Sequence, residues 1–373
     1  MDAYFNAMKI KFNDLNILTD NIFEHSHIKS VNLFINLEDI DSRFRNVKMN
    51  KEFQCCGAGA FKQYASNVFN LIGHYKQWLN RLKVIPRIYV YYTTATAGFT
   101  SNALVPGYRT KYVEKSSTFN ADCYYVNNTI NAADPLIKDI YPFINGVYII
   151  DSKGEEPSVI PYLISQEKPA DWNFVLSKDR VDLQYCLYDK FSILYPSSTY
   201  GPQLINSGNL WTFIAQKEYI ASPHISQFEP KLYFTILGIV GNTFRGVTKL
   251  KRIGWKTIFD YLDEVWEKDG DHSLFTMIDA IEEKVASKGQ DTVDQFMNNM
   301  LALSMKSRYE TMSKASKELI LMQIVDTPDV ESLQQINRDP MIFGNYPMNL
   351  KFLTEELGSG NKPDWSVVKK STL

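Results

Sequence analysis

The sequence predicts an α/β protein with a mostly parallel sheet and flanking helices, followed by a helical region and a helical C-terminal tail. Apolar segments of strand length occur at residues 31–36 and 87–92, with a stretch of helical spacing between them. This order is typical of a βαβ unit whose strands are parallel. From about residue 229, apolar residues recur at helical spacing, and no further apolar segments of strand length follow.

The first unit is the most regular part of the sequence. The segment 31–36, VNLFIN, is apolar enough for a buried strand. Residues 59–83 carry apolar side chains at helical spacing, from Phe61 to Leu82. Pro86 then introduces the second strand. We therefore expect two parallel strands that one amphipathic helix connects.

The segment 93–134 is different in composition. It is rich in Thr, Ser and Asn, it contains glycine and proline turns, and it has no clean periodicity. Its cations Arg109, Lys111 and Lys115 stand beside acidic residues. We expect a long excursion from the domain, and long loops of this kind are often functional or bound to a partner.

After this excursion the α/β pattern resumes. We expect strands at 146–150, 172–176, 191–195 and 209–214, with helices at 135–143 and 156–166. We expect later helices at 229–240, 254–266, 273–287, 291–305 and 308–321. The chain divides into an N-terminal extension (1–30), an α/β domain (31–228), a helical region (229–305) and a C-terminal helical tail (306–373).

Composition limits the functional classes. The 373 residues carry a formal net charge of −2, so contact with a nucleic acid requires a local basic patch. No stretch approaches the ~20 apolar residues of a membrane span, and no leader with a basic start and an apolar run is visible. We therefore expect a cytoplasmic protein without membrane contact.

Cysteines and histidines give little sign of a metal site. The four cysteines lack CxxC spacing, which favours reduced thiols; they are Cys55, Cys56, Cys123 and Cys186. His25 and His27 could chelate a metal, but a solvated loop is the simpler interpretation because no cysteine or carboxylate cluster lies near them in sequence.

The segment 238–257, GIVGNTFRGVTKLKRIGWKT, is the strongest candidate for a binding site. Its glycine turns flank a basic run, and the second turn opens a helix, where backbone N–H groups favour phosphate. Five cations follow within twelve residues: Arg245, Lys249, Lys251, Arg252 and Lys256. An ordinary connection between helices with solvated lysines is the alternative, and it carries equal weight.

This segment resembles the helix-three-turn region of the 5′-nuclease family, the flap endonucleases and phage 5′–3′ exonucleases. The segment 173–184, NFVLSKDRVDLQ, resembles the family's strand ending in Ser-x-Asp-x-Asp-x-x-Gln. The segment 154–160, GEEPSVI, matches its Glu-Ala-Asp-Asp helix start, and Tyr108-Arg109 resembles the Tyr-Lys pair of its arch. Strand 31–36 stands where the family's strand ends at the first catalytic Asp.

These matches occur in the family's order over residues 31–265. The resemblance implies a PIN-like α/β domain in which 93–134 corresponds to the arch. It also implies metal-dependent cleavage of phosphodiesters, in which carboxylates hold divalent ions.

Most of the acids that this chemistry needs are replaced. Residues without a carboxylate stand at these positions: Asn36, Tyr92 or Thr93, Pro157, Ser158, Val181, Ile239 and Asn242. Glu155 and Asp179 remain as catalytic remnants, which we expect to be insufficient for a two-metal site. Four further acids, Glu38, Asp39, Asp41 and Asp182, are interpreted as helix-cap or surface residues. We therefore expect no cofactor, and Mg²⁺ only if the protein is active.

Two main hypotheses follow. The favoured one is a catalytically inactive 5′-nuclease homologue that serves as a nucleic-acid-binding or scaffold subunit of a viral or phage assembly for replication, transcription or the virion. Its partners would be other protein subunits, and DNA through residues 245–256 and Arg109, in the host cytoplasm or the virion. The alternative is an active Mg²⁺-dependent 5′–3′ exonuclease or flap endonuclease with a rearranged ligand set. A third possibility is a DNA-binding accessory protein without any assembly.

Overall fold

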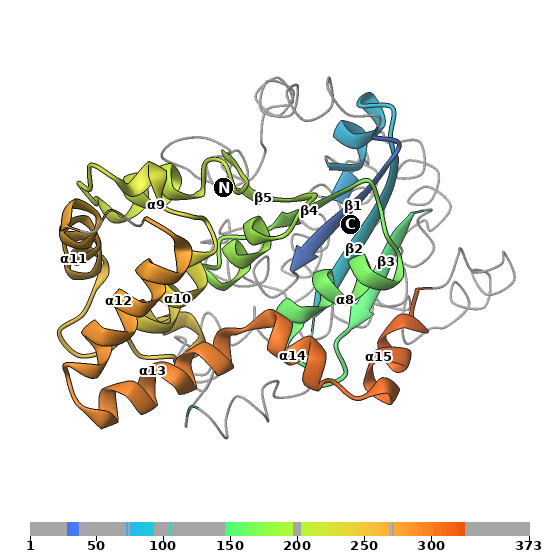
Figure 1. Ribbon diagram of the computed structural model, residues 1–373. Coiled ribbons are helices and arrows are strands. Elements are labelled where there is room, and N and C mark those ends of the chain that lie inside the picture. Colours follow the sequence, from blue (N-terminus) through green and yellow to red (C-terminus); the bar gives the residue numbers. More distant parts are fainter. Residues whose placement is uncertain are drawn as a thin grey trace, which may run out of the picture.

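The structure is a computed structural model, and it describes residues 28–36, 72–73, 75–92, 105, 146–196, 203–268, 270 and 272–324 (Figure 1). Several predictions lie outside these residues: most of the N-terminal extension, the helix at 135–143, the 93–134 excursion apart from residue 105, Arg109, the residues Cys55, Cys56, Cys123, His25 and His27, and the tail beyond residue 324.

The described strands form one six-stranded sheet in the order β3-β2-β1-β4-β5-β6. The strands are β1 (Ser30–Asn36), β2 (Ile85–Tyr92), β3 (Val147–Asp151), β4 (Trp172–Leu176), β5 (Phe191–Tyr195) and β6 (Gln203–Ile205). All neighbours pair in parallel except β5 and β6, which are antiparallel. The mostly parallel α/β class is therefore confirmed.

The helical elements follow the same chain order. The short 3₁₀ segments are η3 (Pro157–Val159), η4 (Val181–Leu187), η5 (Ile225–Gln227) and η6 (Thr243–Arg245). The α-helices are α8 (Ile160–Glu167), α9 (Leu210–Glu218), α10 (Leu232–Val240), α11 (Trp255–Lys268), α12 (Leu274–Ala286), α13 (Gln290–Leu303), α14 (Met305–Thr311) and α15 (Lys314–Leu321). In the described part no helix has the length and apolar character needed to cross a membrane.

The prediction of a strand at 209–214 is wrong, because these residues begin α9. Asparagine side chains organise the preceding turn: the N–H of Asn206 donates to Oδ1 of Asn209 at 2.8 Å, and the N–H of Gly208 donates to Oδ1 of Asn206 at 2.9 Å. Asparagine bonds of this type compete with an extended backbone. The strand that follows β5 is instead β6, which at three residues is too short for a periodicity signal.

The helix predicted at 308–321 is also wrong in its extent, because two helices share this region. Met312 has an extended backbone and is buried between α14 and α15. Ser313 then caps α15, and its Oγ accepts from the N–H of Ser316 at 3.0 Å. A serine N-cap satisfies a backbone donor that a continuous helix would satisfy differently, so it favours a new helix start.

The sheet is buried on both faces. On one face Trp78, from the helical residues 75–81, lies with its ring centroid 5.4 Å from that of Phe174. On the opposite face Phe34 stacks on Tyr89 at 5.2 Å, and both belong to the core cluster that includes α8. Neighbouring residues of a strand point to opposite faces, which explains why apolar residues occur at consecutive positions of these strands.

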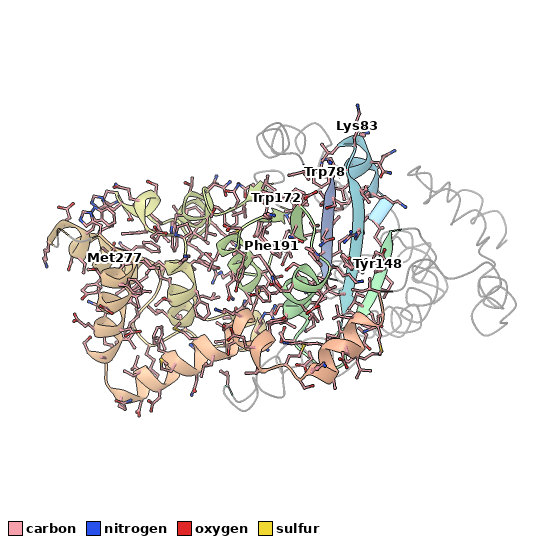
Figure 2. The ribbon with its side chains drawn as sticks, turned by 45° about the vertical axis from the view of Figure 1, so that its right-hand side comes forward. Trp78, Lys83, Tyr148, Trp172, Phe191 and Met277 are labelled. Atoms are coloured by element: carbon pink, nitrogen blue, oxygen red, sulfur yellow. The ribbon has the colours of Figure 1, made fainter. Side chains whose placement is uncertain are left out.

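The helical region lies beside the sheet and continues its core. Helices α9 to α13 lie together at one end of the structure (Figure 1). Met277, which belongs to α12, lies far from Trp78 (Figure 2). From α13 the chain returns along α14 and α15 toward α8 and β3 (Figure 1). Gln323 completes this return, because its side chain donates to the carbonyl of Asp151 at 2.8 Å and accepts from its N–H at 2.9 Å.

This topology defines an edge where chemistry could occur. From β1 the parallel sheet extends to β2 and β3 on one side and to β4 and β5 on the other. In open α/β sheets, sites lie at the carboxyl ends of the strands where the order reverses. Here that point lies between Asn36, at the end of β1, and Asp179, just after β4.

Candidate functional site

A buried group of charged side chains lies at this edge. It consists of Glu156, Asp179 and Asp182 around the guanidinium of Arg245, and we call it the arginine–carboxylate cluster. Each acid comes from a different position: the residue before η3, the turn after β4, and the first turn of η4. The Arg245 side chain is 1% exposed, so the cluster is shielded from solvent.

Asp179 uses both carboxylate oxygens within the protein. Oδ1 accepts from Nδ2 of Asn242 at 2.6 Å and from the N–H of Val181 at 3.0 Å. Oδ2 accepts from Nε of Arg245 at 2.8 Å and lies 2.7 Å from its Nη2. Charge-assisted, two-point contacts of this kind are the strongest hydrogen bonds that side chains form. The carboxylate is therefore held in one orientation.

Glu156 lies between two arginines. Its Oε1 pairs with Nη1 of Arg245, and its Oε2 lies 3.6 Å from Nη1 of Arg308 on α14. Nη1 of Arg245 also donates to Oγ of Ser158 at 3.2 Å. The C-terminal helices therefore add a second cation to the cluster. Sequence reasoning missed Arg308, because it stands far from the family motifs and carries no local signal.

The structure brings Glu156, and not Glu155, to Asp179. Glu155 is half-buried, and its N–H donates to the carbonyl of Ser152 at 3.0 Å. The resemblance had assigned the remaining role to Glu155. Two adjacent glutamates cannot be told apart by a motif match, since only the turn before η3 decides which one faces the sheet edge.

Asp182 also differs from its prediction. It lies in the first turn of η4, whose N-cap is Arg180, and it is completely buried and not on the surface. Its Oδ1 is 4.0 Å from Nη2 of Arg245. The assignment of Asp182 as an ordinary cap or surface acid is therefore wrong.

Arg245 was predicted to contact a nucleic acid, and its burial contradicts this. The backbone directs it inward: Gly241 has φ +61°, Asn242 and Val247 form a β-bridge, and the N–H of Arg245 donates to Oδ1 of Asn242 at 3.1 Å. Gly246 follows in the left-handed region. This tight turn points Arg245 toward the sheet, whereas its sequence signal is the same as that of the neighbouring cations.

The other cations of the loop face outward. They are Lys249, Lys251, Arg252 and Lys256, all exposed, and we call them the outer cations. Between them Leu250 is buried, and its N–H donates to the carbonyl of Ile239 at 2.9 Å. Nδ2 of Asn299 on α13 donates to the carbonyl of Thr248 at 2.9 Å. The loop is therefore fixed to α10 and α13 while its lysines remain in solvent.

A buried tyrosine adjoins the cluster. The hydroxyl of Tyr185 donates to the carbonyl of Ser158 at 2.5 Å. Burial raises the pKa of Tyr185 well above its ordinary value, and the charge of nearby Asp182 raises it further. Tyr185 is therefore a neutral hydrogen-bond donor that fixes the backbone beside Glu156.

Among the described residues, the oxygen donors at this edge do not fit Mg²⁺. Magnesium requires oxygen ligands in a near-octahedral array. Asn36, Val181 and Ile239 supply no carboxylate, and the oxygens of Asp179 and Glu156 already face N–H donors. Within the described ranges, no three His, Cys, Asp or Glu side chains are grouped so that they could hold a metal ion.

Comparison with known proteins finds no matching family model and no matching curated protein. Similar solved structures exist at low identity. The bacteriophage T5 flap endonuclease, in complex with DNA and metal ions, is 12% identical over 88% of this chain and 98% of its own, with a TM-score of 0.44. The T5 5′-exonuclease with bound zinc is 13% identical over 73% and 99%, also at 0.44.

The Holliday junction-resolving enzyme GEN1, in complex with product DNA and Mg²⁺, is 12% identical over 94% of this chain and 77% of its own, with a TM-score of 0.43. The similarity is distant, and it concerns the fold alone.

Proposed function

We propose that this protein is a catalytically inactive, 5′-nuclease-like protein that binds the backbone of a nucleic acid as a subunit of a larger assembly. One observation supports the proposal that the protein does not cleave nucleic acids. At the edge where a nuclease would hold metal ions, the oxygens of Asp179 and Glu156 are engaged by Arg245, Asn242 and Arg308. A carboxylate that is held by N–H donors is a poor ligand for a hard cation.

Binding is assigned to the outer cations. Lys249, Lys251 and Arg252 are exposed on a loop whose backbone is held by α10 and α13, and Lys256 is exposed at the start of α11, so they offer positive charge on a fixed backbone. Contact of this type depends on phosphate charge and not on base sequence. Cleavage and binding thus rest on separate groups of residues, and each can be tested alone.

The test of inactivity is a cleavage assay on 5′-flap and 5′-ended duplex substrates with Mg²⁺ or Mn²⁺. We expect no product. Cleavage that disappears in Asp179→Ala and Glu156→Ala variants would overturn the proposal, because it would show that these carboxylates still support metal-dependent hydrolysis.

The test of binding is the fluorescence anisotropy of a labelled duplex at several salt concentrations. Charge reversal of Lys249, Lys251 and Arg252 to Glu should weaken binding tenfold or more and lower the salt dependence, by roughly one unit of slope for each phosphate that the loop no longer neutralises. The matched control reverses three exposed lysines elsewhere: Lys288 in the turn after α12, Lys306 on α14 and Lys314 on α15. Equal losses of duplex affinity in both triple variants would mean that binding depends on the net charge of the protein and not on the outer cations.

The proposal includes membership of a viral or phage complex for replication, transcription or the virion. This part is supported by the resemblance of the motifs to phage exonucleases. A pull-down with the full chain from its native source is the test. Recovery of defined protein subunits at fixed stoichiometry supports an assembly, whereas recovery of nucleic acid alone supports a free accessory protein.

A further inference from the structure

We propose that the edge of the sheet where the parallel strands begin is a second surface for a nucleic-acid backbone, so that one protein molecule binds two segments at once. Exposed lysines precede β1, β2, β4 and β5 at this edge, and we call them the amino-edge lysines: Lys29, Lys83, Lys168 and Lys190. The strands pair in parallel, so their first residues lie side by side. The fold therefore gathers lysines that are far apart in the chain.

Backbone hydrogen bonds fix the positions of these lysines. The N–H of Ile85, the first residue of β2, donates to the carbonyl of Lys29 at 2.7 Å, and the N–H of Asn173 donates to the carbonyl of Lys190 at 2.8 Å. Lys83 projects from the end of the molecule where β2 begins (Figure 2). Neighbouring strands lie ~4.8 Å apart, so the order β2-β1-β4-β5 spreads the lysines over roughly 15 Å.

Two of the amino-edge lysines have a backbone conformation that side chains rarely adopt. Lys83 has φ +57° and Lys190 has φ +62°, both in the left-handed region. Glycine fits this region more readily because it has no Cβ. Residues with a side chain that are held in this region cluster at functional sites. This conformation favours a role for Lys83 and Lys190 beyond that of solvated turn residues.

Acidic residues near this edge leave the lysines accessible. Asp171 is half-buried, and its Oδ2 accepts from the N–H of Lys29 at 2.8 Å. Burial raises the pKa of Tyr309 on α14, and the charge of Glu167 raises it further, so Glu167 lies near that helix. Asp189 is an exposed acid next to Lys190 in sequence. Among the described residues, none of the amino-edge lysines forms an ion pair with a carboxylate.

The composition of this edge favours a nucleic acid over a protein partner. Lysine is depleted in interfaces between proteins, whose centres are apolar. Ile85 is 67% exposed here, but one apolar side chain does not make an apolar patch. The ammonium group of lysine is a point charge on a flexible stem, which suits a row of phosphates. The class of ligand rests on the proposed function, whereas the residues are separate from the outer cations.

The turn that leads to the outer cations is attached to the other end of the strands. Nδ2 of Asn242 donates to Oδ1 of Asp179, just after the carboxyl end of β4, at 2.6 Å. The five residues of β4 rise by ~3.3 Å each, so roughly 17 Å separates the two edges. Separate segments of nucleic acid can therefore occupy the two surfaces.

The experiment is a bridging assay with the full chain at about 50 mM salt, where phosphate contacts are strong. One duplex is immobilised on beads, and a second, fluorescently labelled duplex is captured through the protein. The natural protein should capture the labelled duplex. Charge reversal of Lys29, Lys83 and Lys190 to Glu should reduce the captured amount tenfold or more, while the protein still binds the beads through the outer cations.

Two further variants isolate the edge. Reversal of Lys288, Lys306 and Lys314 to Glu changes the net charge of the protein equally, and it should leave the captured amount nearly unchanged. Asp189→Lys adds a positive charge beside Lys190, and it should increase the captured amount. Thermal unfolding first establishes that each variant is folded. If the amino-edge reversal is unfolded, substitution of the same three lysines by Gln takes its place in the assay.

Three results would overturn the inference. The first is a natural protein that captures no second duplex at low salt, and the second is an amino-edge variant that captures as much as the natural protein. The third is binding of labelled polyglutamate that the amino-edge variant loses while its bridging is unchanged, because this edge would then fit an acidic protein segment.

Reversal of Lys249, Lys251 and Arg252 separates this inference from the proposed function. If that variant binds a duplex normally while the amino-edge variant does not, the assignment to the outer cations fails and the amino edge remains a binding surface. If only the outer reversal weakens binding and bridging, the proposed function stands and the second surface is excluded.

Discussion

The two ends of one loop have opposite environments. Arg245 lies at the start of the segment 245–256, and it is buried between carboxylates of the sheet edge. The outer cations follow within a few residues, and they are exposed. Identical charges in one basic run thus serve different purposes. The inner charge stabilises the fold, and we assign the outer charges to contact with a nucleic acid.

Charge in a sequence therefore does not by itself define a binding surface. The turn from Gly241 to Gly246 separates the two environments, because it places Arg245 toward Asp179 before the chain returns to solvent. The charge of Arg245 is compensated by carboxylates, whereas the outer cations are exposed to solvent. Substitutions that act on one environment and spare the other can separate these roles.

The largest effect is expected for Asp179→Ala. This variant leaves Arg245 buried without its main partner and removes the acceptor of Asn242. Breaking a buried ion pair from one side costs about 3–5 kcal/mol of unfolding free energy. Urea denaturation is the measurement, and Asp279→Ala, an exposed acid on α12, is the control. A loss below about 1 kcal/mol would mean that the cluster contributes no more than a surface pair.

Gly241→Ala should give the next effect. Gly241 has φ +61°, and a Cβ at this position would lie 2.5 Å from the carbonyl oxygen of Val247. The turn must shift, at a cost of roughly 1–3 kcal/mol. Gly254→Ala is the matched control, because a Cβ there meets nothing within 4 Å.

The same two glycine variants also test whether the turn positions the outer cations for binding a duplex. A displaced turn moves the outer cations relative to α10 and α13, so duplex affinity measured by anisotropy should fall in Gly241→Ala while remaining nearly unchanged in Gly254→Ala. Unchanged affinity in both variants would show that the outer cations act independently of the turn.

Lys256→Ala tests a single outer cation. It lies in the first turn of α11 and is exposed. We expect a small change in stability, since exposed side chains away from a network contribute little. The slope of log Kobs against log salt concentration should decrease by about one unit if Lys256 contacts a phosphate. An unchanged slope would exclude that contact.

The smallest effect concerns a carboxylate outside the cluster. Asp171, before β4, accepts from the N–H groups of Lys29 and Ser30 at 2.8 and 2.9 Å. These bonds lower the pKa of Asp171 below its ordinary value. Because folding lowers this pKa, the stabilisation is present above the unfolded-state pKa and is lost as pH falls through the folded-state pKa.

The measurement is urea denaturation from neutral pH to below about pH 4. Asp171→Asn should lose at most about 1 kcal/mol at neutral pH, because solvent screens this site. Its stability should also decline less on acidification than that of the natural protein. An identical pH dependence in both proteins would contradict a role for Asp171.

Much of the fold could be predicted from local pattern. The strands at 172–176 and 191–195 have the predicted bounds, because buried parallel strands are continuous apolar runs between turns. The prediction of a strand at 209–214 was wrong, since a short apolar run does not distinguish a buried strand from the start of a buried helix. The break between α14 and α15 at Met312 was not predicted, because a single extended residue leaves no periodic signal.

The candidate site could be predicted only in part. Asp179 was identified from its motif, and it belongs to the cluster, where it contacts both Asn242 and Arg245. Glu156, Asp182 and Arg308 were not identified, since each depends on which way a turn faces or on a helix that returns from the C-terminal part. Arg245 was identified as functional but was assigned to the wrong environment.

The sequence by itself determined the periodicity of the strands and helices and the glycine turns, and its resemblance to the 5′-nucleases predicts that most of the family's carboxylates are replaced. These properties are local, because they depend on residue type and spacing. Only the tertiary structure decided that Arg245 enters the cluster and that its neighbours do not. That choice depends on contacts among Glu156, Asp179, Asp182 and Arg308, which lie far apart in the chain and meet only when the sheet and the helices pack together.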